Sequence, residues 1–470
     1  MARGCGISGA VESRRTMPKF RIVASVIAVL LTVSSGGLPA ASAAEPQPAA
    51  TTVSNATRLV RDIGPGWSIP WYQLRERAVR VGKQVYFVVS DDTNGEELWR
   101  SDGTRSGTTR VKAPPSNGGG GIISVSPSNL AALGKYVLYA GNTRSHGRAL
   151  VRSDGTSAGT KLVKDIMPMW MGPVLGKYLY FMGKDQAHGT ELWRTDGTTA
   201  GTTLVSDTNP GEASGGGSHM IAWKNAVYFS GDDGVNGREL WKTAGTPESS
   251  QMVEDARPGP EGSSPYLFEA LGDLLYFFAF DPAEGVELRV SDGESVRLVA
   301  EVAEGAAGSY GREPTARGGY VYFATDTGLW RSNGTAEGTR SIAEFPVDTG
   351  GPSALTTFRG ELYFTLGVGG GDLYRTNGPS AVTRIDLGIA GASVGNETPF
   401  GCGTTLYFAA TDPKEGSELW STKGLSSNVR RLIVRPGKGD AYPDPVACLN
   451  NKLFFAATTS DVGREPRMTK

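Results

Sequence analysis

Short apolar stretches, each ending in Gly, Asp, Asn or Pro, follow one another along the chain from about residue 56 to its end. After residue 50 no long segment carries apolar residues at the helical spacing of three and four. Short apolar runs bounded by turn residues are typical of β-strands. The pattern therefore predicts an all-β protein.

One phrase recurs along this region. An apolar-Tyr-Phe strand is followed by a short Asp/Gly turn, then Glu-Leu-Trp, then Ser/Thr-Asp-Gly-Thr and a further apolar strand. Its clearest copies begin at Glu97 and Glu191, and degraded copies begin at Ala149, Glu239, Glu287, Gly328, Asp372, Glu418 and Glu465. From Tyr86 to Phe454 the central aromatic position advances 368 residues in eight steps, or 46 per step. Four strands in a repeat of that length predict the blade of a β-propeller.

The third repeat shows how the strands are expected to lie. Its pattern predicts strands over 173–176, 178–182, 191–195 and 203–205, with Asp196-Gly197 as a tight hairpin between the last two. Residues 56–63 read as a fourth strand without a blade of its own, and the ninth repeat ends after its third strand. We therefore expect a single propeller over 56–470, closed by pairing of the N-terminal strand with the last blade. About nine blades are expected, with eight as the alternative.

The phrase Glu-Leu-Trp-x-x-Asp-Gly-Thr resembles the ELWxxDGT repeat family of exported bacterial proteins over residues 56–470. The chain departs from this pattern at Arg289, Tyr374 and Arg467, which replace Trp, and at Lys423-Gly424, which replaces Asp-Gly. The resemblance implies a repeat architecture and export, and it supplies no catalytic residues.

The N-terminal segment has the pattern of a cleavable signal peptide over residues 1–43. Basic residues precede the apolar stretch 22–33, which is too short to span a bilayer, and Ala41-Ser42-Ala43 forms a small-residue cleavage motif. Met1 and Met17 are both candidate start sites. Residues 44–55 are expected to be a flexible linker, and the mature protein is expected to be secreted, without stable membrane insertion.

The charge balance and the content of Gly, Pro and Cys bear on the class of partner, the fold and the compartment of the protein. The net charge is −1, so the balance of Lys, Arg, Asp and Glu does not favour nucleic acid. Gly and Pro, 65 and 27 of the 470 residues, suit a turn-rich β-fold. Cys402 and Cys448 lie at matching positions of successive repeats, so they form either a disulfide in an oxidising compartment or two small buried side chains.

A residue type that is present in every blade has a role that every blade needs, so it is expected to be structural. A single binding or catalytic site is instead expected to use residues that are not repeated. The Asp-Gly pairs are expected to form turns. The repeated Trp side chains are expected to pack as wedges between blades, and they are Trp99, Trp193, Trp241, Trp330 and Trp420. Acidic turns such as Asp232-Asp233 could ligate calcium, but no copy has a complete calcium-loop spacing. His146, His188 and His219 are too far apart in the expected geometry for a metal site. No catalytic motif is recognised, and no cofactor is expected.

Candidate binding residues are therefore sought among unrepeated side chains in the loops between blades. These are Trp67, Trp170, His219, Tyr310, Arg312 and Tyr442. The favoured expectation is a non-enzymatic binding or scaffold protein whose loop-rich face docks an extracellular glycan or protein. The alternatives are a hydrolase or lyase that acts on a polymer at the central channel, and a structural coat or spacer.

Overall fold

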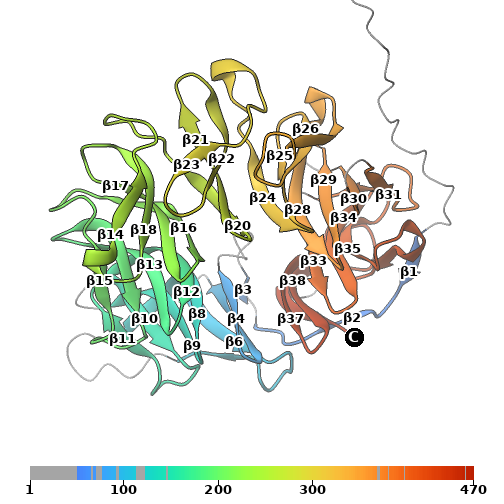
Figure 1. Ribbon diagram of the computed structural model, residues 1–470. Coiled ribbons are helices and arrows are strands. Elements are labelled where there is room, and N and C mark those ends of the chain that lie inside the picture. Colours follow the sequence, from blue (N-terminus) through green and yellow to red (C-terminus); the bar gives the residue numbers. More distant parts are fainter. Residues whose placement is uncertain are drawn as a thin grey trace, which may run out of the picture. The chain divides into compact units, whose positions relative to one another are not determined.

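The structure is a computed structural model that describes residues 50–64, 67–69, 77–91, 95–112, 122–143, 147–367, 371–378, 381–395, 397–460 and 462–470. These residues form nine sheets arranged in a ring, antiparallel except for one added edge strand, which is a nine-bladed β-propeller (Figure 1). The predicted fold class is confirmed, with nine blades rather than eight. The expected signal peptide, its cleavage site and the two candidate start sites lie outside the described residues.

The blades are numbered along the chain, and their strands are given from the inside of the ring outward. Blade 1 contains β3 (Trp67–Ser68) and β4 (Ala78–Val81), both paired with β5 (Gln84–Asp91), then β6 (Gly95–Ser101) and β7 (Thr109–Arg110). Blade 2 contains β8 (Ile122–Leu133), β9 (Tyr136–Thr143), β10 (Gly147–Ser153) and β11 (Lys161–Lys164). Blade 3 contains β12 (Met167–Leu175), β13 (Tyr178–Asp185), β14 (Gly189–Thr195) and β15 (Thr203–Ser206).

Blade 4 contains β16 (Gly216–Trp223), β17 (Ala226–Asp232), β18 (Arg238–Thr243) and β19 (Gln251–Glu254). Blade 5 contains β20 (Tyr266–Leu271), β21 (Leu274–Asp281), β22 (Gly285–Ser291) and β23 (Val296–Leu298). Blade 6 contains β24 (Arg312–Arg317), β25 (Tyr320–Ala324), β26 (Gly328–Ser332) and β27 (Arg340–Glu344). Blade 7 contains β28 (Pro352–Phe358), β29 (Glu361–Leu366), β30 (Asp372–Thr376) and β31 (Thr383–Ile385).

Blade 8 contains β32 (Ser393–Val394) and β33 (Phe400–Cys402), both paired with β34 (Thr405–Asp412), then β35 (Gly416–Thr422), β36 (Arg430–Leu432) and β1 (Thr51–Val53). Blade 9 contains β37 (Asp444–Leu449), β38 (Lys452–Thr459), β39 (Gly463–Thr469) and β2 (Thr57–Leu59). The helices of the described residues are four short 3-10 turns, η1 (Pro247–Ser249), η2 (Gly305–Ala307), η3 (Val347–Thr349) and η4 (Ser426–Asn428).

The hydrophobic core is divided into nine clusters, and each cluster joins two neighbouring blades. For example, Tyr180 and Leu192 of blade 3 pack with Val227 and Phe229 of blade 4. The same packing continues from blade 9 to blade 1, where Phe454 lies against Phe87 with ring centroids 5.6 Å apart. Stability of the ring therefore comes from contacts between sheets, as in other repeat proteins.

The repeated Trp side chains are part of these clusters. Trp99 packs in the interface between blades 9 and 1, Trp193 in that between blades 2 and 3, and Trp420 in that between blades 7 and 8. Trp241 and Trp330 are half-buried against the clusters that their blades share with a neighbour. The predicted role of these side chains as wedges between blades is confirmed.

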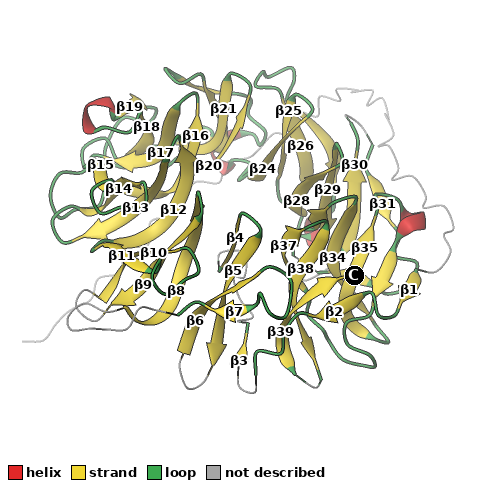
Figure 2. Cartoon of the chain, turned by 90° about the horizontal axis from the view of Figure 1, so that it is seen from below, coloured by secondary structure: helices red, strands yellow, loops and turns green. Residues whose placement is uncertain are grey.

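The N-terminal strands belong to the last two blades (Figure 2). The strand β2 pairs antiparallel with β39, with Thr57 opposite Thr469 and Leu59 opposite Arg467. The strand β1 pairs parallel with β36 at the outer edge of blade 8. The expected linker over 44–55 is therefore wrong at Thr51–Val53, because the free edge of β36 gives this segment backbone partners.

The turn between the third and fourth strands is wider than the predicted two-residue hairpin. In blade 3 the third strand ends at Thr195 and the fourth begins at Thr203. Asp196 accepts hydrogen bonds from the backbone N–H and the hydroxyl of Thr198, and the hydroxyl oxygens of Thr195 and Thr202 lie 2.7 Å apart. Gly197 takes a φ of 84°, which favours glycine. The Ser/Thr-Asp-Gly-Thr phrase and the Gly-Thr that follows it are thus one hydrogen-bonded turn.

The repeated Glu clamps the loop that leads to the next blade. Glu191 is fully buried and accepts hydrogen bonds from the backbone N–H groups of Thr208 and Gly215. Glu418 accepts from Val434 and Arg435 at 2.7 and 3.0 Å. Burial raises the pKa of both carboxyl groups to about 7, against the opposing effect of these N–H donors. This loop clamp is the role of Glu in the Glu-Leu-Trp phrase.

The inner strands differ most from expectation. Trp170 was expected in a loop between blades, but it lies near the start of the inner strand β12. Its register slips twice, between Pro168 and Trp170 and between Met171 and Val174. The inner strands of blades 2 to 7 and of blade 9 all carry such bulges. Bulges interrupt the alternation of apolar and polar residues, which is why the sequence pattern misses these strands.

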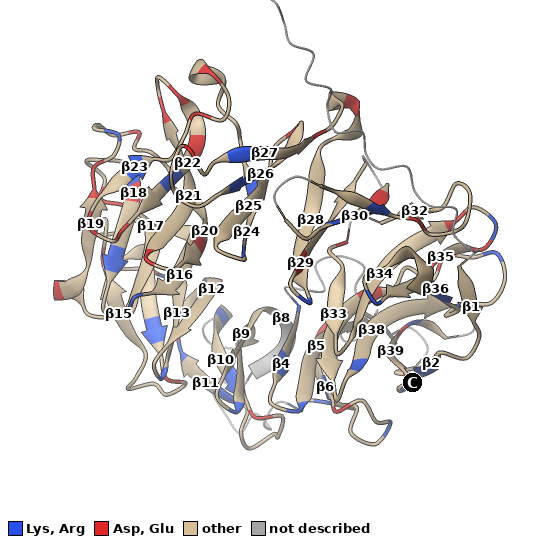
Figure 3. Ribbon diagram, turned by 45° about the vertical axis from the view of Figure 1, so that its right-hand side comes forward, with Lys and Arg blue, Asp and Glu red and all other residues tan. Residues whose placement is uncertain are grey.

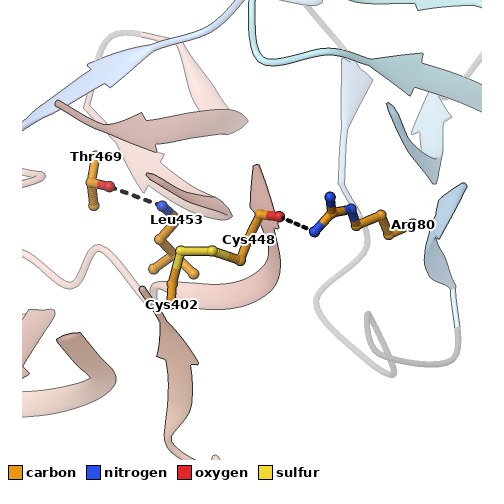
Figure 4. The surroundings of a disulfide bond; sticks show 5 residues. All are labelled: Arg80, Cys402, Cys448, Leu453 and Thr469. Carbon is orange, nitrogen blue, oxygen red and sulfur yellow. Dashed lines mark hydrogen bonds between the residues drawn. A yellow bond between two sulfur atoms is a disulfide. The ribbon is translucent and has the colours of Figure 1, made fainter. Parts of the chain in front are cut away.

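A disulfide joins blades 8 and 9. Cys402 ends β33, Cys448 lies near the end of β37, and their sulfur atoms are bonded (Figure 4). Of the two alternatives that the sequence left open, the structure has the bonded pair. The carbonyl oxygen of Cys448 also accepts a hydrogen bond of 2.7 Å from Arg80 of blade 1. The three blades around the point of closure are therefore directly linked.

Candidate functional site

The inner strands of blades 3 to 6 carry large unlike side chains at one level of the ring. The level is defined by the second-strand residue two positions after the central aromatic. Trp170 pairs with Met182 at this level, Tyr266 with Phe278, and Arg312 with Ala324. His219 lies in the bulge of β16 between Gly216 and Met220, opposite the same level of blade 4.

Three of these residues are aromatic and stand at this level of three consecutive inner strands, and they are called here the inner rim: Trp170, His219 and Tyr266. Trp170 is 40% exposed although it stands on a strand. The rings of His219 and Tyr266 lie 6.0 Å apart, and Tyr266 lies 6.0 Å from Phe278 behind it. Burial lowers the pKa of His219 below its usual range, so its ring is neutral near pH 7. Since His219 was expected in a loop, its place on β16 is a correction.

Ser218 lies beside His219 in the same bulge. Its hydroxyl oxygen is 3.2 Å from the Nδ1 atom of His219, and the side chain is exposed. A hydroxyl within hydrogen-bond reach of a neutral imidazole is the first requirement of an activated nucleophile. Sequence reasoning missed Ser218 and Tyr266, because neither residue is distinctive until the bulges place both at one level.

Arg312 is a positioning residue of the loop face. Its guanidinium binds Asp326 at 2.6 Å and donates to the carbonyl oxygens of Thr325 and Gly350 at 3.1 Å. It thus ties the inner strand of blade 6 to the loop that enters blade 7. Tyr310 is 56% exposed just before this strand. Burial raises the pKa of Tyr266, and the charge of Tyr310 adds to this effect.

Two further candidates lie away from the inner rim. Tyr442 precedes the inner strand of blade 9, is 48% exposed, and donates a hydrogen bond of 2.9 Å to Asp440. Trp67 belongs to β3 of blade 1, and its side chain is outside the described residues. The structure therefore places Trp170 and His219 at one level of neighbouring inner strands, whereas Tyr442 belongs to blade 9.

Acidic residues of the turns are engaged within their own turns. Asp185 accepts from the backbone N–H groups of Ala187 and His188 and binds the His188 ring at 2.9 Å. Asp233 accepts from the N–H groups of Val235 and Asn236. Over the described residues no group of three His, Cys, Asp or Glu side chains is placed to hold a metal ion. His146, one of the three histidines, is outside the described residues.

Two features of the whole surface bear on partners. Basic and acidic residues are interspersed over the blades in the view of Figure 3. In the described part of the chain there is no helix of the length and hydropathy that crossing a membrane requires.

Comparisons with known proteins identify no family. No family model matches the chain, and no curated protein matches it. The resemblance to the ELWxxDGT repeat family therefore stays a prediction.

Solved structures match at low identity. They include a puromycin hydrolase at 16% identity with a TM-score of 0.39, covering 87% of this chain and 61% of that one. A prolyl endopeptidase matches at 11% identity with a TM-score of 0.43, covering 84% and 55%. Oligopeptidase B from Leishmania major matches at 9% identity with a TM-score of 0.42, covering 85% and 52%. This chain thus spans between about half and three fifths of these enzymes.

The comparison corrects one expectation. The sequence favoured a non-enzymatic binding or scaffold protein. The three solved structures are all named as hydrolytic enzymes. That expectation is therefore withdrawn.

Proposed function

We propose that the ring takes part in the hydrolysis of peptides and that a peptide binds at the inner rim. The observation that supports this most is the placement of Trp170, His219 and Tyr266 at one level of three consecutive inner strands. The Trp170 side chain is exposed and those of His219 and Tyr266 are half-buried, so their rings can receive the apolar side chains of a peptide. The hydrolytic proteins named above make peptides the first substrates to test.

Strand edges add a second attraction for an extended peptide. The strands β12, β16 and β20 each stand at the inner end of their sheet and pair with one strand only. An extended peptide can add to such an edge through its main chain, while pockets select its side chains. Some inner edges are closed by a neighbouring blade: Asn129 donates to the carbonyl oxygens of Pro168 and Met169, which limits where a peptide could pair.

A second candidate function is cleavage by the ring itself, with Ser218 as the nucleophile. His219 Nδ1 would take the proton of Ser218 as the oxygen adds to the peptide carbonyl carbon. The amine would leave with that proton, and water would then release the acyl group from Ser218. The distance of 3.2 Å between the two side chains favours this candidate.

Export is proposed as well. The signal-peptide pattern of residues 1–43 and the Cys402–Cys448 disulfide both suit an oxidising compartment outside the cytoplasm. No cofactor is proposed.

One experiment tests both candidates. The mature chain is incubated with a fluorogenic peptide library and with a fluorophosphonate probe, followed by peptide mapping. We expect peptide binding that Trp170→Ala weakens, and cleavage with probe labelling that Ser218→Ala abolishes. Ser353→Ala is the matched control, because Ser353 stands at the same level of blade 7. Binding without cleavage or labelling would eliminate the second candidate, and the absence of binding would eliminate both.

A further inference from the structure

We propose that a cavity between blades 8 and 9 is a binding site for a small phosphate monoester. The cavity has a volume of ≈ 290 Å³ and lies on the side of the third-to-fourth strand turns. Its walls come from the end of β35, from β36, and from the segments around β1 and β39. It is separate from the inner rim, since none of its lining residues belongs to blades 3 to 5.

The cavity exists because blade 8 departs from the repeat. In most blades the third-strand residue after the Trp position is Arg or Lys, and this side chain reaches the turn of the next blade. Arg152 donates to the carbonyl oxygen of Gly197 at 2.6 Å, and Lys242 donates to that of Gly293 at 2.7 Å. Blade 8 has Ser421 at this position, opposite Tyr407. A small buried side chain therefore leaves the space open.

Blade 9 lacks the turn that joins the third and fourth strands in other blades. Its fourth strand is β2, which comes from the N-terminal side of the chain and not through a turn from β39. No turn equivalent to Asp196–Thr202 thus joins the third and fourth strands of blade 9.

Arg430 is the cation that this missing turn leaves without an acceptor. It stands on the fourth strand opposite Ser421, as Arg297 of blade 5 stands opposite Val290. Arg297 donates to the carbonyl oxygen of Gly334 in the next blade at 2.8 Å. Because no turn joins β39 to β2, this acceptor has no counterpart among the described residues of blade 9, and Arg430 lines the cavity.

Further basic groups surround the same space. Lys423 replaces the Asp that begins the turn in full copies of the repeat, and it lines the cavity together with Arg430 and Lys470. All three are exposed, and no Asp or Glu side chain is among the lining residues. Across the described chain, none of the three has a carboxylate within salt-bridge distance. Thr405 and Asn428 add a hydroxyl and an amide that can donate hydrogen bonds.

Charge and size together indicate the ligand. Three basic side chains, offset only by the α-carboxylate of Lys470, favour an anion, and a dianion gains more from them than a single carboxylate does. A phosphate monoester carries nearly two negative charges at neutral pH and offers three acceptor oxygens. At about 30 Å³ per water molecule, the cavity has room for roughly ten waters, so a sugar-sized body fits behind the phosphate.

The test uses the mature chain without a tag after Lys470, in low-salt buffer near neutral pH. Inorganic phosphate and glucose 6-phosphate are titrated by calorimetry, with glucose and with sodium chloride at matched ionic strength as controls. We expect both phosphates to bind, with glucose 6-phosphate tighter. Binding should weaken by about tenfold or more in Arg430→Gln.

Two variants make the test specific. Arg340→Gln is the matched control, because Arg340 holds the position of Arg430 in blade 6; it should leave affinity unchanged. Ser421→Arg restores the usual repeat residue, and it should fill the cavity and abolish binding while the melting temperature is kept. The absence of phosphate binding, or an equal loss in Arg340→Gln and Arg430→Gln, would overturn the proposal.

Discussion

At the residue scale, each residue of the repeated phrase has its own structural role. Leu and Trp fill the interfaces between blades, Asp and Thr order the third-to-fourth turn, and Glu clamps the next loop. The sequence predicted the Trp and Asp roles because each depends on local pattern. The role of Glu was missed because its donors are distant: Thr208 and Gly215 lie 17 and 24 residues after Glu191.

Removing one clamp should destabilise the ring measurably. Glu418→Ala leaves the N–H groups of Val434 and Arg435 without their acceptor. The expected loss in the free energy of unfolding is roughly 1–3 kcal/mol for each buried donor. Urea denaturation measures it, with Glu337→Ala as the control, since Glu337 is exposed. Equal midpoints for the two variants would show that the clamp contributes nothing.

At the scale of strands, the second and third strands follow the pattern closely and the first strands do not. In blade 3 the predicted strand 191–195 lies within β14, but the predicted strand 173–176 catches only the end of β12. The candidate site is built on inner strands, and the bulges of these strands interrupt the sequence pattern that would have predicted them. Trp170 and His219 could be named from composition, whereas their shared level required the register of the sheets.

The strand β2 should be needed for a stable last blade. Without residues 50–63, β39 loses its outer partner and Glu465 loses the N–H donor of Ile63. We expect a chain that starts at Gly64 to melt at a lower temperature and to self-associate through the exposed strand edge. Thermal melting and light scattering test this, with a chain that starts at Ala50 as the control. A monomeric chain from Gly64 with an unchanged melting temperature would contradict it.

At the scale of the whole molecule, the ring has nine interfaces between blades, and one of them differs chemically from the other eight. The interface between blades 8 and 9 has the disulfide, the added strand β1 and the phosphate-site candidate. Its cavity could not be read from the sequence, because it arises from what blade 9 lacks and not from a motif.

The disulfide should contribute substantially to this interface. Cys402 and Cys448 are separated by 46 residues, for which the chain-entropy relation gives about 4 kcal/mol. Replacing both with Ala should lower the free energy of unfolding by roughly 2–4 kcal/mol. Reduction of the unmodified protein is the parallel measurement, and the doubly substituted protein, which lacks this bond, should not respond to the reductant.

The buried clamps should also make the stability of the whole ring depend on pH. Burial raises the pKa of Glu465 to about 8, and that of Glu191 and Glu418 to about 7. Groups whose pKa is higher in the folded protein bind protons more tightly there, so their stabilising effect is complete below the unfolded value near 4.5 and is lost as pH rises through 7 to 8. The melting temperature should therefore fall between pH 5.5 and 8.5. Glu465→Gln, which cannot ionise but can still accept from Ile63, should reduce this fall, and an identical pH profile in that variant would contradict the assignment.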